Sequence, residues 1–256
     1  MTLKFYKYQG TGNDFILIDN RTAEFDPEDT ELVKSLCDRR FGIGADGLIL
    51  LEDCVGFDFQ MVYFNSDGNQ SSMCGNGGRC IVQFAKDMGV IKKETTFIAI
   101  DGEHDAFIEN NLVHLKMIDV AGVEQIGNDY YLNTGSPHYV KAVSDIKNYA
   151  VYDQGYAIRN NDRFKAVGTN VNFIEESGDA LWVRTFERGV EDETFSCGTG
   201  VTAAALASSL KGAESPVKIK TLGGDLQVSF AKDGEKFTNI YLVGPAKQVF
   251  RGTIEI

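Results

Sequence analysis

The sequence predicts an α/β protein made of two pseudosymmetric domains. The first observation behind this prediction is that short strand-like runs alternate with helix-like runs. The second is a pattern that occurs once in each half: a strand-like run, a loop, the motif C-G-x-G and a helix. The motif is Cys74-Gly75-Asn76-Gly77 in the first half and Cys197-Gly198-Thr199-Gly200 in the second. A repeat of this size indicates duplicated domains rather than a solenoid.

Periodicity, glycine and proline define the elements of the first half. A helix is expected from about residue 26 to residue 39, with Pro27 near its first turn. A second helix begins at Gly75, because apolar residues recur at helical spacing up to Gly89, which ends it. Alternating or continuous apolar runs predict strands at residues 3–8, 15–19, 48–51 and 57–64.

The second half repeats this order around its own glycine-rich loop. A strand is expected at residues 180–187 and a helix of small residues at about 198–210, closed by Gly212. A stretch with Gly and Asp interrupts the pattern over residues 117–128, so we expect one domain over residues 1–117 and the other over residues 118–246. Further strands are expected at residues 96–100, 113–117, 217–221 and 226–230.

The composition, 43% hydrophobic and 24% charged, is that of an ordinary globular protein, and we expect a cytoplasmic enzyme. The net charge of −12 opposes binding to nucleic acids and to anionic membranes, which need a basic surface. No apolar run is long enough to cross a bilayer, and the first residues lack an export signal. The 5 cysteines are an odd number in such a chain, which favours reduced thiols over a disulfide framework.

Cys74 and Cys197 each directly precede a predicted helix. The unpaired backbone N–H groups and the positive end of the helix dipole lower the pKa of a thiol there and attract anions. The glycines let a ligand approach the backbone closely. One such loop is compatible with a nucleophile, a redox thiol or a phosphate site. Two related loops that face each other across a domain cleft suit the inversion of a carbon centre.

Inversion requires a proton to leave one face of a carbon and another to arrive on the opposite face. One thiolate and one thiol do this directly, and they exchange roles with the direction of reaction. The helix starts are expected to hold the substrate α-carboxylate and to stabilise the charge that develops on it, without pyridoxal phosphate. The N–H groups concerned belong to Gly75, Asn76, Gly198 and Thr199.

The remaining cysteines suggest no further chemistry. Cys37, Cys54 and Cys80 are interpreted as packing residues. With 3 histidines and no C-x-x-C pair, we expect no metal site. A Cys74–Cys197 disulfide would need tight domain closure and would be an oxidised, inactive form.

Six motifs together resemble one enzyme family. Residues 65–79, NSDGNQSSMCGNGGR, closely resemble the signature of the diaminopimelate epimerases. The other motifs match in order: GTGNDF at 10–15, GIGADG at 42–47, GTNVNF at 168–173, ERG at 187–189 and SCGTG at 196–200. Each short motif is weak by itself, but the ordered set from about residue 6 to residue 206 is highly specific.

This resemblance implies the conversion of LL-diaminopimelate to the meso isomer, in lysine and peptidoglycan biosynthesis, without a cofactor. The fold implied has in each domain a mainly antiparallel sheet wrapped around a central helix, with the active site in the interdomain cleft. The last strand, residues 247–256, would return to the first domain, and the protein would be a homodimer. No nucleic-acid or membrane partner is expected.

The resemblance also implies roles for individual residues. Cys74 and Cys197 would be the acid/base pair, and Glu187 and His138 would flank the reacting centre. A second carboxylate on the substrate suits a guanidinium, and a second ammonium suits amide oxygens. The end of the substrate that is not inverted would therefore be bound by Asn13, Asn65, Asn170 and Arg188.

Three positions depart from the usual pattern of that family. Many relatives have Asn where Ser136 stands and Gln where Gly47 stands, and Asn69 replaces the usual Ser. Substrate contacts at Ser136 and Gly47 would be absent or water-mediated.

Other functions compete with this interpretation. A proline or hydroxyproline racemase would share the chemistry, but a small cyclic substrate has no use for a distal site with Arg188. Phenazine-type isomerases typically lack the cysteine pair. A cysteine hydrolase would need a Cys–His pair, for which His138 is a candidate, but it has no use for a second C-G-x-G loop. A non-catalytic binding module would expose two reactive thiols to oxidation.

Overall fold

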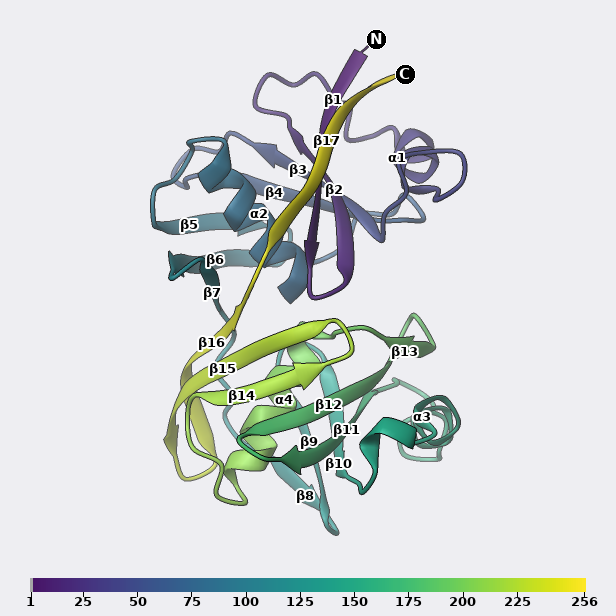
Figure 1. Ribbon diagram of the computed structural model, residues 1–256, viewed down its shortest axis with the longest axis vertical. Coiled ribbons are helices and arrows are strands. Elements are labelled where there is room, and N and C mark those ends of the chain that lie inside the picture. Colours follow the sequence, from purple (N-terminus) through teal and green to yellow (C-terminus); the bar gives the residue numbers. More distant parts are fainter. Residues whose placement is uncertain (1) are drawn as a thin grey trace. The chain divides into compact units, whose positions relative to one another are not determined.

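The computed structural model describes residues 2–256 and has an α/β fold, as the sequence predicts. The chain divides into two compact units, which Figure 1 shows in ribbon form. Unit 1 runs from the N-terminal strand to Leu115 and adds Pro245–Ile256, and unit 2 is Lys116–Gly244.

Unit 1 is built on mainly antiparallel strand pairs. β1 pairs antiparallel with β2, β2 pairs parallel with β3, and β3 pairs antiparallel with β4. One parallel pairing joins β4 to β5, and β5, β6 and β7 form an antiparallel meander. The elements are β1 (Thr2–Gly10), β2 (Asn13–Asp19), α1 (Thr30–Cys37), β3 (Gly47–Glu52), β4 (Gln60–Asn65), α2 (Gly75–Asp87), β5 (Glu94–Ala99), β6 (Gly102–Glu109), β7 (Leu112–Lys116) and β17 (Lys247–Glu255).

The last strand completes unit 1. β17 pairs antiparallel with β1 along the whole length of that strand, from Thr2↔Glu255 to Gln9↔Lys247. Figure 1 shows β17, in yellow, lying along the purple β1. Residues more than 230 positions apart in the sequence are therefore neighbours in this unit, as in the hydrogen bond between Thr2 and Glu255 (|i−j| = 253).

The same order of pairings recurs in unit 2. β9 pairs antiparallel with β10, β10 parallel with β11, β11 antiparallel with β12, and β12 parallel with β14. β14, β15 and β16 form an antiparallel meander, as β5, β6 and β7 do in unit 1. The elements are β8 (Glu124–Ile126), β9 (Asp129–Asn133), β10 (Pro137–Ala142), the 3₁₀ helix η1 (Ile146–Asn148), α3 (Val151–Arg159), β11 (Asn170–Ser177), β12 (Ala180–Glu187), β13 (Asp192–Thr194), α4 (Gly198–Ser209), β14 (Val217–Thr221), β15 (Gly224–Asp233) and β16 (Lys236–Gly244).

Helices α2 and α4 are the buried helices of the two units. Every residue of α4 except Thr199 is buried, and in α2 all residues from Gly75 to Val82 are buried. A helix covered on all sides must carry small or apolar residues all round. The Ala, Gly, Ser and Val residues of α4 meet this need, and its glycine-rich start lets the sheet approach closely.

The structure differs from the sequence prediction at the first helix. α1 begins at Thr30 rather than near residue 26, because Asp29 caps it by accepting a hydrogen bond from Leu32 N at 3.0 Å. It ends at Cys37 instead of residue 39. The prediction also omitted α3, β6, β8, β9, β10, β11, β13 and β16.

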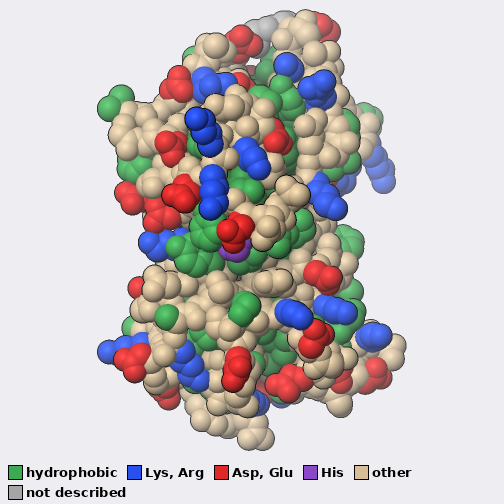
Figure 2. All heavy atoms as spheres, turned by 60° about the vertical axis from the view of Figure 1, so that its left-hand side comes forward, with side chains coloured by type: hydrophobic (Ala, Val, Ile, Leu, Met, Phe, Trp, Pro, Cys, Tyr) green, Lys and Arg blue, Asp and Glu red, His purple; other side chains and the backbone are tan. Residues whose placement is uncertain are grey.

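The molecular surface carries both signs of charge. Figure 2 shows acidic and basic side chains interspersed over the face in view. Some surface charges of the protein pair, as Lys218 does with Asp179 at 2.7 Å. Among the described residues, no helix is long and apolar enough to span a membrane.

Candidate active site

Cys74 is the residue that precedes helix α2 in unit 1. β4 ends at Asn65, and the loop that follows leads to Cys74, whose extended backbone (φ −101°, ψ 147°) turns into the helix. The Sγ of Cys74 accepts a hydrogen bond from the N–H of Gly77 at 3.2 Å. The sulfur thus occupies the position of an N-cap oxygen, where the backbone N–H groups favour a thiolate.

Arg79 is fully buried within this helix start. Its guanidinium donates to Gly75 O, Thr11 Oγ1 and Asn76 Oδ1, each at 3.1 Å. All three acceptors are neutral, and burial lowers the pKa of Arg79 to about 10. Arg79 therefore brings a positive charge close to Cys74 and fixes the backbone and side chain that follow it.

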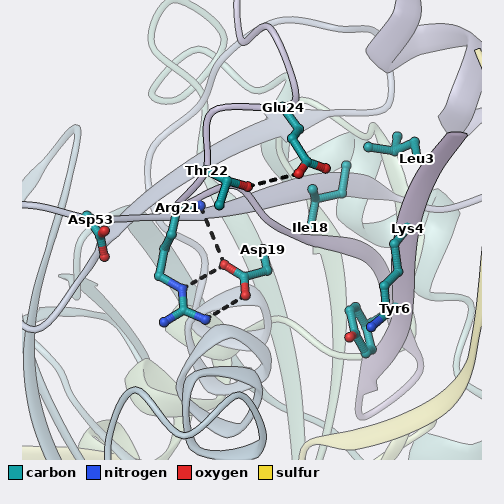
Figure 3. Close-up of a pocket in the computed structure, with 9 residues that line it drawn as sticks. All are labelled: Leu3, Lys4, Tyr6, Ile18, Asp19, Arg21, Thr22, Glu24 and Asp53. Atoms are coloured by element: carbon teal, nitrogen blue, oxygen red, sulfur yellow. Dashed lines mark hydrogen bonds and ion pairs between the residues drawn. The ribbon is translucent and has the colours of Figure 1, made fainter. Parts of the chain in front are cut away.

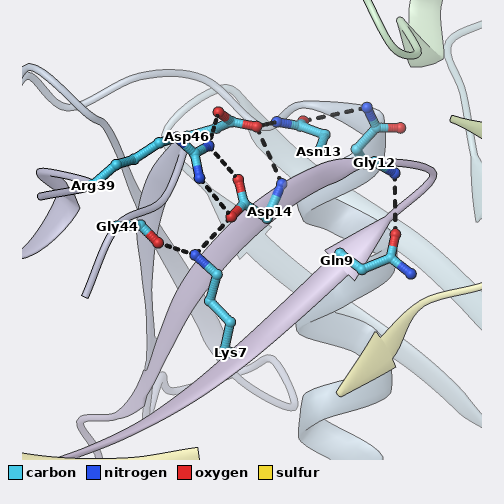
Figure 4. Close-up of polar contacts among 9 residues, drawn as sticks. Lys7, Gln9, Gly12, Asn13, Asp14, Arg39, Gly44 and Asp46 are labelled. Atoms are coloured by element: carbon cyan, nitrogen blue, oxygen red, sulfur yellow. Dashed lines mark hydrogen bonds and ion pairs between the residues drawn. The ribbon is translucent and has the colours of Figure 1, made fainter. Parts of the chain in front are cut away.

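Asn13 is fixed by a charged network between β2 and the loop before β3, drawn in Figure 4. Its Nδ2 donates to Asp46 Oδ2 at 2.6 Å, and its Oδ1 accepts from Asn76 Nδ2 at 3.2 Å. Arg39 bridges Asp46 and Asp14, with 2.6 Å to each carboxylate. Burial raises the pKa of Asp14, but Arg39 and a buried lysine on β1 outweigh it and lower that pKa to about 2.

Gly47 and Asn69, two of the positions that depart from the usual family pattern, both lie next to Asn65, the last residue of β4. Asn65 lies opposite Gly47 of β3, and its N–H donates to Asn69 O at 2.9 Å. A Cβ at Gly47 would lie 2.5 Å from Phe64 O and 2.6 Å from the Tyr63 ring. The chain packing at Gly47 therefore leaves no room for a side chain, which accounts for the glycine there.

Cys197 precedes helix α4 in unit 2. Its backbone is extended (φ −114°, ψ 113°), and the residue is buried. Its Sγ lies 3.5 Å from Thr199 Oγ1. The backbone oxygen of Thr199 accepts from Thr134 Oγ1 at 2.9 Å, which ties the helix start to the segment after β9.

Asn170 holds the end of strand β12. Its Oδ1 accepts the N–H of Arg188 at 2.9 Å, and its Nδ2 donates to Ser136 Oγ at 2.9 Å. The Arg188 side chain donates to Val167 O at 3.2 Å. Glu187 Oε2 accepts from a threonine of β13 at 2.9 Å. Asn170 therefore positions the backbone between Glu187 and Arg188.

His138 lies in the core of unit 2. It is fully buried, and this burial, together with the charge of Arg188, lowers its pKa to about 3. Asn172 Nδ2 lies 3.0 Å from its Nδ1, and its Nε2 has no hydrogen-bond partner among residues 2–256.

The other three cysteines differ in burial. Cys37 and Cys80 are buried, as predicted for packing residues, and burial raises the pKa of both thiols, that of Cys37 to about 12. Cys54 is only partly buried, because it lies in the loop after β3, so its interpretation as a packing residue is wrong. All 5 cysteines are thiols rather than disulfides. Within residues 2–256, no group of three or more His, Cys, Asp and Glu side chains is arranged to hold a metal ion.

A hollow of about 380 Å³ in unit 1 contains none of the predicted site residues. Figure 3 shows that Asp19 and Arg21 face each other there, with Nη2–Oδ2 at 2.6 Å. Beside this ion pair, Thr22 Oγ1 donates to Glu24 Oε1 at 3.2 Å. The lining residues are Leu3, Lys4, Tyr6, Ile18, Asp19, Arg21, Thr22, Glu24 and Asp53.

The predicted residues divide between the two units. Unit 1 contains Asn13, Asn65, Cys74, Gly75 and Asn76, and unit 2 contains His138, Asn170, Glu187, Arg188, Cys197, Gly198 and Thr199. Sequence reasoning missed Asp46, Arg79 and Asn172, which hold these residues in place. The signal for Arg79 was a charged residue at a helix start whose other residues are uncharged.

The sequence is similar to that of known epimerases. A family model described as diaminopimelate epimerase matches residues 5–112 and 130–249. The chain is 54% identical to the diaminopimelate epimerase of Flavobacterium psychrophilum, over 98% of this chain and 100% of that protein. It is 46% identical to the diaminopimelate epimerase of Chlorobaculum tepidum, over 96% and 99%.

The fold is similar to that of two further groups of proteins. A phenazine biosynthesis protein of the PhzF family from Bacillus anthracis matches with a TM-score of 0.76 and 14% identity, over 100% of both chains. A probable proline racemase from Agrobacterium radiobacter matches with a TM-score of 0.67 and 16% identity, over 99% of this chain and 92% of that one. At such identities the likeness shows the fold alone.

Proposed function

This chain belongs to the diaminopimelate epimerase family, and from that premise we propose that it interconverts LL- and meso-diaminopimelate with Cys74 and Cys197 as the two acid/base groups. The family consists of isomerases, and the reaction belongs to lysine biosynthesis. The observation that carries the proposed mechanism is the position of the two thiols. Each directly precedes the buried helix of its unit, at the same place in the same order of strands.

In the proposed mechanism each of the two helix starts supplies one thiol to the substrate. One cysteine, as a thiolate, removes the α-proton and becomes a thiol, while the other thiol gives its proton to the opposite face and becomes a thiolate. The carbanion's charge spreads into the α-carboxylate, where the N–H groups of the two helix starts stabilise it. These N–H groups belong to Gly75, Asn76, Gly198 and Thr199.

The distal amino-acid end of the substrate would be bound by amides and a guanidinium. The NH₂ group of Asn13 donates to Asp46, so its Oδ1 faces the other way. This oxygen accepts from Asn76 Nδ2 and has a second lone pair for a substrate ammonium. Arg188 would pair with the distal carboxylate. Asn65 and Asn170 would complete this end, and Glu187 and His138 would flank the reacting carbon.

The finer features of the enzyme are part of the same proposal. The reaction would need no pyridoxal phosphate or other cofactor, because the helix starts act as the electron sink. The chain would work as a homodimer in the cytoplasm, without a nucleic-acid or membrane partner. Its net charge of −12 supports the last point.

The test is proton exchange. Reduced enzyme is incubated with LL-diaminopimelate in deuterated water without pyridoxal phosphate or metal. The products are separated by chiral chromatography and their deuterium content is measured by mass spectrometry. We expect meso product that carries α-deuterium. Exchange with proline but not with diaminopimelate would keep the two-thiol mechanism and replace the substrate. No exchange with either would refute the proposal.

Single Cys74→Ser and Cys197→Ser variants test the roles of the thiols. Each is expected to lose epimerisation by about 10²- to 10⁴-fold, the usual contribution of one acid/base group, because loss of either one blocks one face. Cys54→Ser is the matched control, since Cys54 is a partly buried loop thiol, and it should keep full activity. Full turnover in either of the first two variants would exclude the two-thiol mechanism.

A further inference from the structure

Three polar side chains form a row across neighbouring strands β10, β11 and β12 of unit 2. They are His138, Asn172 and Thr185, and their exposed fractions are 0%, 0% and 3%. Asn172 lies directly opposite Thr185 in the pairing of β11 with β12. Buried polar groups are costly unless they are hydrogen-bonded, so the hydrogen bonds of this row determine what each group can do.

The orientation of the Asn172 amide follows from its neighbours. One end of the amide lies 3.2 Å from the backbone oxygen of Tyr139, and a backbone oxygen only accepts hydrogen bonds. That end must therefore be the NH₂ group. The other end, Oδ1, accepts from Thr185 Oγ1 at 2.9 Å. The second hydrogen of the NH₂ group is directed to His138 Nδ1, 3.0 Å away.

This arrangement determines the tautomer of His138. Because Nδ1 accepts a hydrogen bond, it carries a lone pair, and a neutral ring then has its hydrogen on Nε2. That Nε2 is buried and has no hydrogen-bond partner in the part of the chain that the structure describes. A buried donor without an acceptor costs about 1–3 kcal/mol. The cost is removed when a ligand brings the acceptor.

We propose that Asn172 is a positioning residue that fixes His138 as a neutral Nε2–H donor, so that His138 serves the epimerisation as a hydrogen-bond donor to an anionic group and not as a base. The role of His138 in the reaction rests on the proposed function. The tautomer does not, because it follows from contacts within unit 2 alone.

The start of α4 connects this row to Cys197. A Cβ at Gly200 would lie 2.4 Å from Asn172 Oδ1 and 3.2 Å from Cys197 Cβ. Asn172 therefore packs against Gly200, in the first turn of α4 after the thiol, as well as lying beside the ring of His138. Its position couples the orientation of the imidazole to the helix start.

The tautomer is tested by ¹⁵N NMR on the full chain labelled at histidine, without substrate at pH 7. The His138 signal is assigned by its loss in His138→Gln. We expect a hydrogen on Nε2 and a bare Nδ1. A hydrogen on Nδ1, or a doubly protonated ring, would overturn the proposal without any need for a variant of Asn172.

Asn172→Asp tests the positioning role. It replaces the NH₂ donor by an acceptor of the same shape, so the hydrogen should move to Nδ1 of His138, and kcat/KM for diaminopimelate should fall at least about tenfold (about 1.4 kcal/mol). The matched control is Asn20→Asp, a buried asparagine of unit 1 that bonds Phe25 and Glu52. It should leave both the His138 signals and kcat/KM unchanged.

The outcomes separate the two proposals. Unchanged His138 signals or unchanged kcat/KM in Asn172→Asp would refute the positioning role. The expected tautomer in an enzyme that does not epimerise diaminopimelate would refute the proposed function and leave the tautomer assignment intact.

Discussion

The two thiols proposed for catalysis have different surroundings although both precede a helix. Cys74 is partly exposed and accepts a hydrogen bond from a helix N–H, whereas Cys197 is buried beside a threonine hydroxyl. The sequence predicted both positions because glycines mark the start of each helix. It could not predict the difference, which depends on side chains brought together from other strands.

The positioning residues illustrate the same limit. Asp46 belongs to a motif that the sequence analysis recognised, but its bond to Asn13 spans 33 positions of the chain. Asn172 and His138 are 34 positions apart and meet only because β10 and β11 pair in parallel. Such pairs require the strand register, which a single sequence does not give.

His138 is expected to make the stability of unit 2 depend on pH. Its folded pKa of about 3 lies below the unfolded value of about 6.5, so its contribution is complete above pH 6.5 and is lost as the pH falls toward 3. Between pH 7.5 and 5 this loss is about 2 kcal/mol. Urea unfolding of the wild type and of His138→Gln at both pH values measures it.

His104 and His114 belong to unit 1 and are present in both proteins, so their contributions cancel in this comparison. The variant should lose about 2 kcal/mol less than the wild type over the same interval. An identical pH dependence in the two proteins would show that His138 is not held neutral.

At the scale of elements, the strands and helices with strong periodicity were predicted closely. The strand at Ala180–Glu187 and the strand at Val217–Thr221 have the predicted bounds, and α4 ends one residue early. Helix α3 was missed because its sequence is polar on several sides and contains Gly155, which packs against Phe186. The internal repeat would have predicted it, because α3 lies between β10 and β11 as α1 lies between β2 and β3.

Gly200→Ala is expected to disturb the start of α4. The added Cβ would lie 2.4 Å from Asn172 Oδ1 and 3.3 Å from Cys197 Sγ, so the helix start must shift. We expect a loss of about 1–3 kcal/mol of stability, as for other overpacked sites, and a fall in kcat/KM that exceeds the loss of folded protein. Gly122→Ala is the control, because its Cβ would meet nothing within 4 Å. Equal stability and activity in both variants would contradict the packing at Gly200.

Arg79→Met separates the stability of α2 from its function. The Arg79 guanidinium bonds only neutral acceptors, and its burial costs about 3 kcal/mol, judged from the shift of its pKa to about 10. Removing the charge removes this cost, which partly offsets the loss of the three hydrogen bonds. We therefore expect the free energy of unfolding to change by less than about 3 kcal/mol. The value of kcat/KM should fall at least about tenfold, because Gly75 and Asn76 lose their anchor.

Chemical denaturation and steady-state kinetics on the same preparation measure both quantities. Arg79→Lys keeps the positive charge but loses the guanidinium, whose N–H groups donate to three acceptors. Its kcat/KM should therefore lie between those of the wild type and Arg79→Met. Wild-type kcat/KM in Arg79→Met would show that Arg79 serves stability alone.

At the scale of the whole molecule, unit 1 is discontinuous in sequence and unit 2 is continuous. The return of the last strand was expected from the family resemblance and not from periodicity, since β17 is exposed along most of its length. β17 is held in place by its pairing with β1 and by a few side-chain contacts. Phe250 packs edge-on against Phe5 with ring centroids 6.0 Å apart, and Ile254 packs on the core of unit 1.

Truncation after Ala246 removes β17 and is expected to destabilise one unit selectively. Strand β1 would lose its pairing with β17 from Thr2 to Gln9 and present an unpaired edge, which promotes aggregation. Unit 2 would lose none of its own residues. Hydrogen exchange with mass spectrometry should therefore show lost protection in β1 and β2 and retained protection in α4 and β12.

Val249→Thr, at an exposed site on β17, keeps the strand and should leave protection unchanged. Equal loss of protection in both units after truncation would mean that they unfold as one cooperative structure.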